Sequence, residues 1–215
     1  MSFIELSSGV RERDTSLILG QVMSLVAAAI GLFALCTYLG RDLAFETARI
    51  FSIAGMVMLV ATWFVSRLRY GSLGILWLGL IASAIGYGLG PVVAFYASTN
   101  PSSVTSAAGI TALTVLGMGA IGFVLSKDTV RWMRPLSFIV IGAVVVSLGA
   151  LVFGGLGTLS PFVSLIILGA SALLILVDFN YVRKHATEDD VVWLATGIFV
   201  SIVNIFVSLL NLFNR

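Results

Sequence analysis

One carboxylate lies inside a long apolar run near the end of the chain. Asp178 follows the apolar residues 172–177 and precedes Phe179. An ionisable side chain within a membrane span is costly, usually faces the interior of a helix bundle, and often marks a proton or ion pathway. Asp178 is therefore a candidate for a buried group that changes its charge with pH or binds a cation. The alternative interpretation is an interfacial carboxylate that pairs with Arg183 or Lys184.

A second feature is a stripe of small and polar residues in the last apolar run. Its members are spaced four, three, four and three positions apart, which places them on one face of a helix: Gly197, Ser201, Asn204, Ser208 and Asn211. Ser and Asn side chains can hold helices together in lipid, and their oxygens are also suitable ligands for hard cations. The sequence leaves both roles open. We take Asp178, Ser201 and Asn204 as the candidate pH sensor and ion path.

No catalytic or cofactor-binding pattern accompanies these residues. The single histidine, His185, lies in a charged segment, and the single cysteine, Cys36, lies in an apolar run. One cysteine excludes an intrachain disulfide and a cysteine–histidine metal framework. Because no base, nucleophile or metal-binding set converges in the apolar runs, we expect neither an enzyme nor a cofactor. The net charge of +2, without a basic cluster, argues against a nucleic-acid partner.

The elements that must position these residues are membrane helices. The chain of 215 residues is 59% hydrophobic and 10% charged, whereas a soluble domain has about 25% charged residues. We predict an all-α polytopic membrane protein in a lipid bilayer, with a short tail over residues 1–14 and a single seven-helix transmembrane domain over residues 15–215. Each predicted helix approaches the ~20 residues that cross a bilayer: 15–39, 47–66, 72–97, 104–125, 133–153, 160–181 and 191–213.

The basic residues predict the orientation, because Lys and Arg are enriched in cytoplasmic links. If the spans alternate, nine of the 12 basic residues lie on one side: Arg11, Arg13, Arg67, Arg69, Lys127, Arg131, Arg134, Arg183 and Lys184. The N-terminus is then cytoplasmic. Seven full crossings put the C-terminus outside, whereas a last segment that only dips into the membrane would leave it inside. As a helix, residues 191–213 span ~34 Å, which favours a full crossing.

Small residues are regularly spaced in the third predicted helix. They recur at a spacing of four, three and four: Gly79, Ser83, Gly86 and Gly90. A similar stripe covers residues 20–31 of the first helix. We expect both stripes to be helix contacts, because small residues let backbones approach closely in lipid. Gly90 and Pro91 together are also a candidate helix break that would loosen the third helix for a gate.

Three segments resemble the Bax inhibitor-1 family. They are IGYGLGPVVAFY over residues 85–96, VDFNYVRKHATEDD over residues 177–190, and FVSIVNIFVSLLNLF over residues 199–213. The resemblance covers essentially the whole chain in helix number, length and orientation, and the short tail is similar to the bacterial inner-membrane branch. It implies a central C-terminal helix wrapped by the other six and a pH-sensitive calcium leak. Some bacterial relatives instead associate with a membrane-bound protease and modulate it.

The resemblance also implies roles for single residues. In calcium-leak relatives, aspartates on the sixth and last helices share protons as a pH sensor; Asp178 matches the first, and Ser201 occupies the position of the second. A basic residue after the second helix can latch the first aspartate, and Arg67 and Arg69 are the candidates here. We therefore expect a calcium or proton leak gated near Asp178, in a bacterial inner membrane. The alternative is a non-transporting regulator of a membrane protease or another membrane protein.

Overall fold

The computed structural model describes residues 3–152 and 161–214, with side chains over residues 15–142 and 161–214. These residues form seven long helices and no β-strand. The helices are α1 (Phe3–Leu39), α2 (Phe45–Phe64), α3 (Gly71–Thr99), α4 (Pro101–Val124), α5 (Met133–Val152), α6 (Pro161–Lys184) and α7 (Val191–Phe213). Short 3-10 turns lie between some of them: η1 (Ser66–Arg69), η2 (Val130–Trp132) and η3 (Glu188–Asp190).

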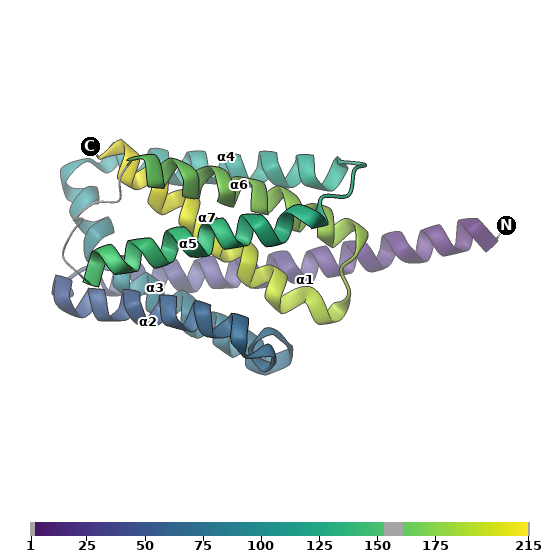
Figure 1. Cartoon of the computed structure of the whole chain (residues 1–215), viewed down its shortest axis with the longest axis horizontal. Coiled ribbons are helices and arrows are strands. Elements are labelled where there is room, and N and C mark those ends of the chain that lie inside the picture. Colours follow the sequence, from purple (N-terminus) through teal and green to yellow (C-terminus); the bar gives the residue numbers. More distant parts are fainter. Residues whose placement is uncertain (1–2, 153–160, 215) are drawn as a thin grey trace.

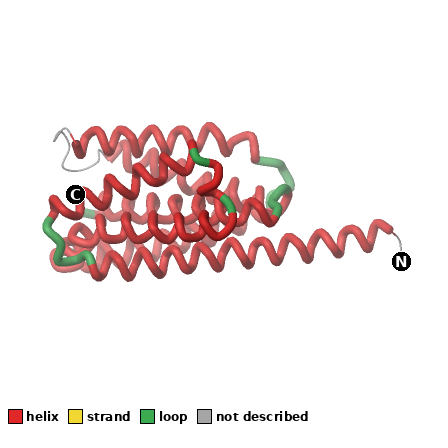
Figure 2. The backbone as a smooth tube through the Cα atoms, turned by 90° about the horizontal axis from the view of Figure 1, so that it is seen from below, coloured by secondary structure: helices red, strands yellow, loops and turns green. Residues whose placement is uncertain are grey.

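Six of the described helices are long and apolar enough to cross a membrane: α1, α2, α3, α4, α6 and α7. In α1 the candidate span is Thr15–Leu39, but the helix already begins at Phe3. The residues that we expected to form a separate short tail therefore continue α1. Figure 1 shows these first turns projecting beyond the other helices, and Figure 2 shows the helices side by side with their loops at the two ends.

Helix α7 packs against several others and crosses the bundle obliquely (Figure 1). It contacts α1, α3, α4 and α6, and it is the most buried of the six candidate spans. Its fully buried side chains include Leu194, Ile198, Phe199 and Ile205. A helix that is apolar around most of its circumference is typical of the interior of a bundle.

The stripe glycines Gly86 and Gly90 of α3 are helix contacts, as predicted. A Cβ added at Gly86 would lie 2.6 Å from the carbonyl oxygen of Phe33, and a Cβ at Gly90 would lie 2.5 Å from the carbonyl carbon of Gly40. On another face, a Cβ at Gly88 would lie 2.2 Å from the hydroxyl of Ser52. Because no side chain fits at these positions, glycine sets how closely α1 and α2 approach α3.

The predicted contact stripe of α1 is wrong. A Cβ at Gly20 or Gly31 would have no atom within 4 Å, and the residues between them in the stripe, Ser24 and Ala27, are exposed. The buried face of α1 instead carries mostly larger side chains: Ile18, Val22, Val26 and Ala29. These fill the core against α3 and α7, so the small residues are rotated out of the bundle.

Gly90 and Pro91 do not end α3, which is helical from Gly71 to Thr99 with Pro91 inside it. Pro91 has no N–H, so the carbonyl of Tyr87 lacks its helical donor. That carbonyl faces Gly40, where an added Cβ would come within 2.9 Å of the Tyr87 oxygen. Figure 1 shows the last turns of α3 running across the end of the bundle before α4 begins. The pair therefore bends the helix rather than breaking it.

Three links that contain Lys or Arg, or directly follow them, lie at the same end of the bundle (Figure 1). They are η1 between α2 and α3, residues 125–132 between α4 and α5, and residues 185–190 between α6 and α7. The third follows Arg183 and Lys184 in the last turn of α6. The projecting part of α1 leaves the bundle at this end as well. This is the clustering that alternating crossings predict for Lys and Arg. Residues 154–159, between the fifth and sixth predicted helices, contain no charged residue and lie outside the described residues.

Candidate functional site

Asp178 lies in the last two turns of α6 and is turned into the bundle. Its side chain is only 4% exposed. The carboxylate oxygen Oδ2 is 3.6 Å from the position that a Cβ would take at Gly197 of α7. The carboxylate therefore packs against α7 at Gly197, at a distance that a methyl group would also allow. This position differs from that of an interfacial carboxylate, which would be exposed to solvent.

The basic residues that follow Asp178 bind another helix. Arg183 Nη1 donates to the carbonyl oxygens of residues 123 and 124, at 2.6 and 3.1 Å. Lys184 Nζ donates to the carbonyl oxygen of Ser126 at 2.5 Å. These acceptors lie at the C-terminal end of α4, where positive charge is favourable. The ion pairs found among the described residues do not include Asp178.

The two predicted latch arginines also lie apart from Asp178. Arg69 donates from Nε to the carbonyl oxygen of Thr62 at 2.7 Å, and from Nη2 to the carbonyl oxygen of Trp63. Its guanidinium thus caps the C-terminal end of α2. Arg67 is exposed. The predicted latch is therefore not formed among the described residues, because backbone carbonyls at the end of α2 hold Arg69 instead.

Among the residues whose side chains are described, the helices around α6 bring no other charge to Asp178. The elements packed against α6 are α1, α4, α5, α7 and η2. Helices α4 and α7, and residues 15–39 of α1, contain no Asp, Glu, Lys or Arg. The basic residues of η2 and of the first turn of α5, Arg131 and Arg134, are exposed. Within the described structure, Asp178 is thus a buried carboxyl group without a countercharge, which is unfavourable when it is ionised.

Two contacts fix the register of α6 against α7. Near one end, Asp178 lies against Gly197. Near the other end, Asn211 Nδ2 donates to Ser164 Oγ at 2.8 Å. The two contacts are fourteen residues apart on each helix, from Asp178 to Ser164 on α6 and from Gly197 to Asn211 on α7. Because the two helices are antiparallel neighbours, the midpoints of these intervals, residues 171 and 204, lie level with each other.

These residues form a row that we call the α6–α7 polar ladder: Ser164, Ser171 and Asp178 of α6, and Gly197, Ser201, Asn204, Ser208 and Asn211 of α7. Steps of seven residues stay on nearly the same helix face, with a drift of ~20° per step. Ser201 and Ser208 are buried, so the predicted stripe of α7 does face inward. The sequence reasoning missed Ser164 and Ser171, although their seven-residue spacing from Asp178 was a usable signal.

The middle of the ladder contains two unpaired polar atoms. Ser171 Oγ and Asn204 Nδ2 are both buried, and neither has a hydrogen-bond partner among the described residues. Buried polar groups are almost always hydrogen-bonded, so an exception needs an explanation. No group of three or more His, Cys, Asp or Glu that could hold a metal occurs within the described residues. The ladder offers one carboxylate together with hydroxyl and amide groups.

Asn180, two residues after Asp178, was also missed by the sequence reasoning. It is fully buried, and Oδ1 accepts from the backbone N–H and the hydroxyl of Thr129 at 3.1 and 3.0 Å. Nδ2 donates to the carbonyl oxygens of Gly122 and Leu125, each at 3.0 Å. These four bonds tie the end of α4 and the following loop to α6. They hold the segment of α6 that carries Asp178 in place.

An exposed pair joins the same two segments at the surface. His185 Nε2 lies 2.7 Å from Asp128 Oδ2. The other carboxylate oxygen, Oδ1, accepts from the backbone N–H of Val130 at 3.0 Å. The Val130 N–H, followed by the His185 side chain, lowers the pKa of Asp128 below its ordinary value. Asp128 is thus a second titratable carboxylate, tied to the residue that follows α6, and it differs from Asp178 in being exposed.

Asp128→Asn is expected to lower thermal stability at neutral pH. Because the pKa of Asp128 is lowered in the folded protein, its ionised form stabilises the fold above the ordinary carboxyl pKa, and this contribution is lost as the pH falls through the lowered pKa. The difference in Tm between the parent and the variant should therefore shrink as the pH falls from about 7 to about 3. Thermal unfolding in detergent at several pH values measures it. A difference that does not change with pH would contradict this interpretation.

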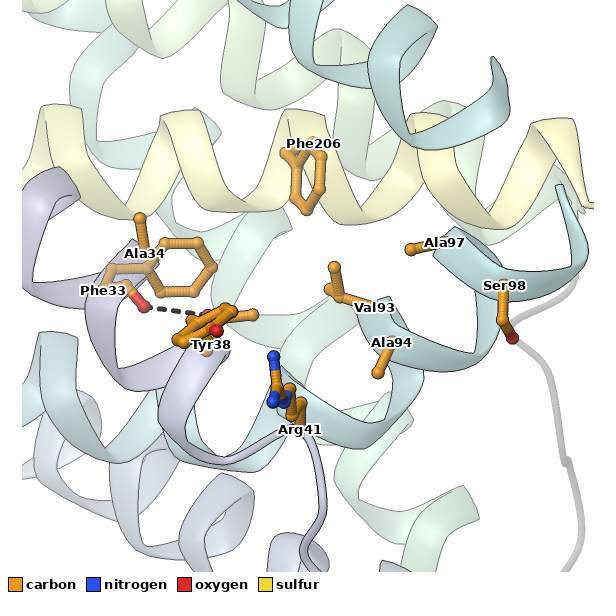
Figure 3. A pocket seen from close by; sticks show the side chains of 11 residues that line it. Phe33, Ala34, Tyr38, Arg41, Val93, Ala94, Ala97, Ser98 and Phe206 are labelled. Carbon is orange, nitrogen blue, oxygen red and sulfur yellow. Dashed lines mark hydrogen bonds between the residues drawn. The ribbon is translucent and has the colours of Figure 1, made fainter. Parts of the chain in front are cut away.

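A groove of about 610 Å³ opens between α1, α3 and α7 (Figure 3). It reaches Arg41, in the link after α1, whereas Asp178 lies toward the end of the bundle where α1 begins. Val93, Ala94 and Ala97 line one wall, and Phe206 extends from α7 toward the same space. Its charged side chain, Arg41, is paired with Asp42 at 3.3 Å. This mostly apolar lining suits hydrocarbon better than a hydrated ion. We therefore take the polar ladder, and not the groove, as the candidate functional site.

Residues 15–215 match the family model described as inhibitor of apoptosis-promoting Bax1. The chain belongs to the Bax inhibitor-1 family. An uncharacterized protein of Pseudomonas aeruginosa is 27% identical over 220 residues, which cover 97% of this chain and 94% of the relative. An uncharacterized membrane protein of Vibrio cholerae is 29% identical over 147 residues, which cover 66% of this chain and 63% of the relative. With its apolar helices, this Bax inhibitor-1 family member is an integral membrane protein.

Proposed function

We propose that this protein is a pH-sensitive cation leak, carrying calcium or protons, with its gate near Asp178. The observation that carries the proposal is the burial of Asp178 against Gly197 without a countercharge among the described residues. An ionised carboxylate there must attract water or a cation into the α6–α7 interface, whereas a protonated one is compatible with dry packing. The protonation state of Asp178 is thereby coupled to the packing of α6 against α7. Such coupling is what a pH switch requires.

The rest of the polar ladder supplies a route from this gate toward the other end of the bundle. Asp178 is about 9 Å from the end of α6 at Lys184, at ~1.5 Å per residue. Beyond it lie the hydroxyl and amide groups of Ser201, Asn204 and Asn211. Hydroxyl and amide oxygens can replace part of the hydration shell of a hard cation. A leak of this kind needs no catalytic group, and we assign no enzymatic activity to the protein.

We further propose seven crossings of a bacterial inner membrane, with α5 as one of them and α7 at the centre. The contacts of α7 with four other helices support the central position. The shared end of the basic links supports a common cytoplasmic side for these links and for the N-terminus. In this orientation the gate at Asp178 lies near the cytoplasmic face.

The test is ion flux in liposomes that contain only the purified protein. A calcium indicator and a pH indicator inside the liposomes report the two candidate ions, and protein-free liposomes provide the baseline. We expect flux of at least one ion above the baseline, with a clear dependence on pH between about 5 and 8. Flux equal to that of protein-free liposomes for both ions, at every pH in this range, would refute the leak.

A second candidate function is regulation of another membrane protein, such as a protease. One observation favours it: the small-residue stripe of α1 faces away from the bundle. The family resemblance also implies that Ser201 occupies the position of the second aspartate of calcium-leak relatives. Exposed small residues allow close approach of a helix from a partner. Gly31→Leu has open space around it, so it should disturb such a partner without disturbing the fold. A protease that co-purifies with the parent but not with Gly31→Leu would favour this function.

A further inference from the structure

The register of α6 against α7 brings the two unpaired polar atoms to one level of the ladder. Ser171 lies seven residues from both Ser164 and Asp178, and Asn204 lies seven residues from both Gly197 and Asn211. Ser171 is fully buried, and its Oγ has no partner among the described residues. The same holds for Nδ2 of Asn204. The unpaired atoms are thus a matched pair on facing helices and not two unrelated exceptions.

These two atoms do not bond to each other, although their chemistry would allow it. The Asn204 amide is a donor and the Ser171 hydroxyl is both donor and acceptor, so direct contact would give a hydrogen bond. A single water molecule satisfies both groups when they are too far apart to bond directly. The water accepts a hydrogen bond from the Asn204 amide, and it either donates a hydrogen bond to the Ser171 hydroxyl or accepts one from it. Buried waters typically occupy such positions between otherwise unsatisfied polar groups.

We propose that Ser171 and Asn204 bind a water molecule between α6 and α7. The site lies about 10 Å along the helices from Asp178 and about 10 Å from the Ser164–Asn211 bond, at ~1.5 Å per residue. It is about 20 Å from the Lys184 end of α6 and about 15 Å from the Pro161 end, so it lies deep inside a ~30 Å hydrocarbon layer. Neutral hydroxyl and amide groups suit water better than a calcium ion, which takes six to eight oxygen ligands, usually including carboxylates.

The water also has a place in the proposed leak, and this part of the inference rests on the proposed function. A hydrated level halfway along the ladder divides the dry distance between Asp178 and the opposite end into two steps of about 10 Å. Removing the water should therefore reduce flux without removing its pH dependence, because the gate at Asp178 is untouched. The proposal that Ser171 and Asn204 bind a water molecule can be tested without measuring flux.

The direct test is water-edited solid-state NMR on the protein in liposomes. Magnetisation transferred from water to the Asn204 side-chain amide reports a water molecule beside it. Asn180 is the internal control, since its side chain is also buried but is fully bonded to protein groups. We expect fast transfer to Asn204 and slow transfer to Asn180. Equal, slow transfer to both amides would overturn the proposal.

A thermal double-mutant cycle with Ser171→Ala and Asn204→Leu gives an independent test. If a water bridges the two residues, each single variant should lower Tm by about 2–4 °C, and the double variant should lower it by little more than either single variant. If both groups are dry and unpaired, replacing either by an apolar side chain should leave Tm unchanged or raise it. That second result would also overturn the proposal.

Flux separates this inference from the proposed function. Ser171→Ala is expected to reduce flux at least threefold at the pH where the parent conducts best, and to keep the pH dependence of the parent. Water transfer to Asn204 in a protein without flux would sustain the water site and refute the leak. Flux in the parent with slow transfer to Asn204 would sustain the leak and refute the water site.

Discussion

Asp178→Asn is expected to abolish the pH dependence of flux. The amide keeps the shape of the carboxyl group but cannot ionise, so the α6–α7 interface no longer changes between a charged and a neutral state. The ratio of flux at about pH 5 to flux at about pH 7.5 should fall to about one, and the variant should behave at both pH values as the protonated parent does. The measurement is a pH series in liposomes for the parent and the variant.

Asp128→Asn is the matched control for this series. Asp128 lies in the loop held by the same end of α6 and is also a carboxylate, but it is exposed and paired with His185. It should retain the pH profile of the parent. If Asp178→Asn keeps the profile and Asp128→Asn loses it, then the switch is the exposed pair at the surface, and Asp178 has a structural role.

Gly122→Ala is expected to be the most destabilising single-methyl change in α4. A Cβ at this position would lie 2.1 Å from the carbonyl oxygen of Leu176 and 2.9 Å from its carbonyl carbon. Both atoms belong to the α6 backbone, so the clash can be relieved only by moving one helix. The move would also disturb the bond from Asn180 to the Gly122 carbonyl. We expect Tm to fall by about 10 °C, which corresponds to a loss of about 3 kcal/mol.

Gly117→Ala provides the control on the same helix. A Cβ at Gly117 would have no atom within 4 Å, and alanine has the better helix propensity by about 1 kcal/mol. Its Tm should equal or slightly exceed that of the parent in the same detergent. If Gly122→Ala were as stable as Gly117→Ala, α4 and α6 would be farther apart than the structure has them.

The long helices could be predicted from sequence because a bilayer imposes both length and apolar composition. The predicted and observed bounds agree within a few residues for α2, α4 and α7, where charged or proline-containing links mark the ends. The first helix differs, because nothing between Phe3 and Thr15 stops a helix and residues outside the membrane can extend it. The break predicted at Gly90 and Pro91 is a bend, because α3 continues where α1 and α2 pack closely against it.

Helix rotation was harder to predict than helix position. Small-residue stripes on α1 and α3 look alike in the sequence, yet only the α3 stripe faces other helices. The larger side chains of α1, such as Val22 and Val26, fill the core and turn its stripe outward. Partners across helices were harder still. Arg69, Arg183 and Lys184 were candidates to neutralise Asp178, but backbone carbonyls at or just after helix ends bind them instead. Which backbone carbonyls lack a helical donor and lie within reach of a basic side chain depends on the fold, so these partners could not be predicted from the sequence.

The central claim is that a change in the protonation state of Asp178 itself switches flux on or off, and infrared difference spectroscopy tests it most directly. In membranes containing the protein, a carbonyl band of a protonated carboxyl group should appear on acidification and be missing from Asp178→Asn. Its midpoint should coincide with the midpoint of the flux profile of the parent. Asp178 is not the switch if the band is unchanged in Asp178→Asn. The same conclusion follows if, in the parent, the midpoint of the band and the midpoint of flux differ by more than about one pH unit, which is a factor of ten in proton concentration.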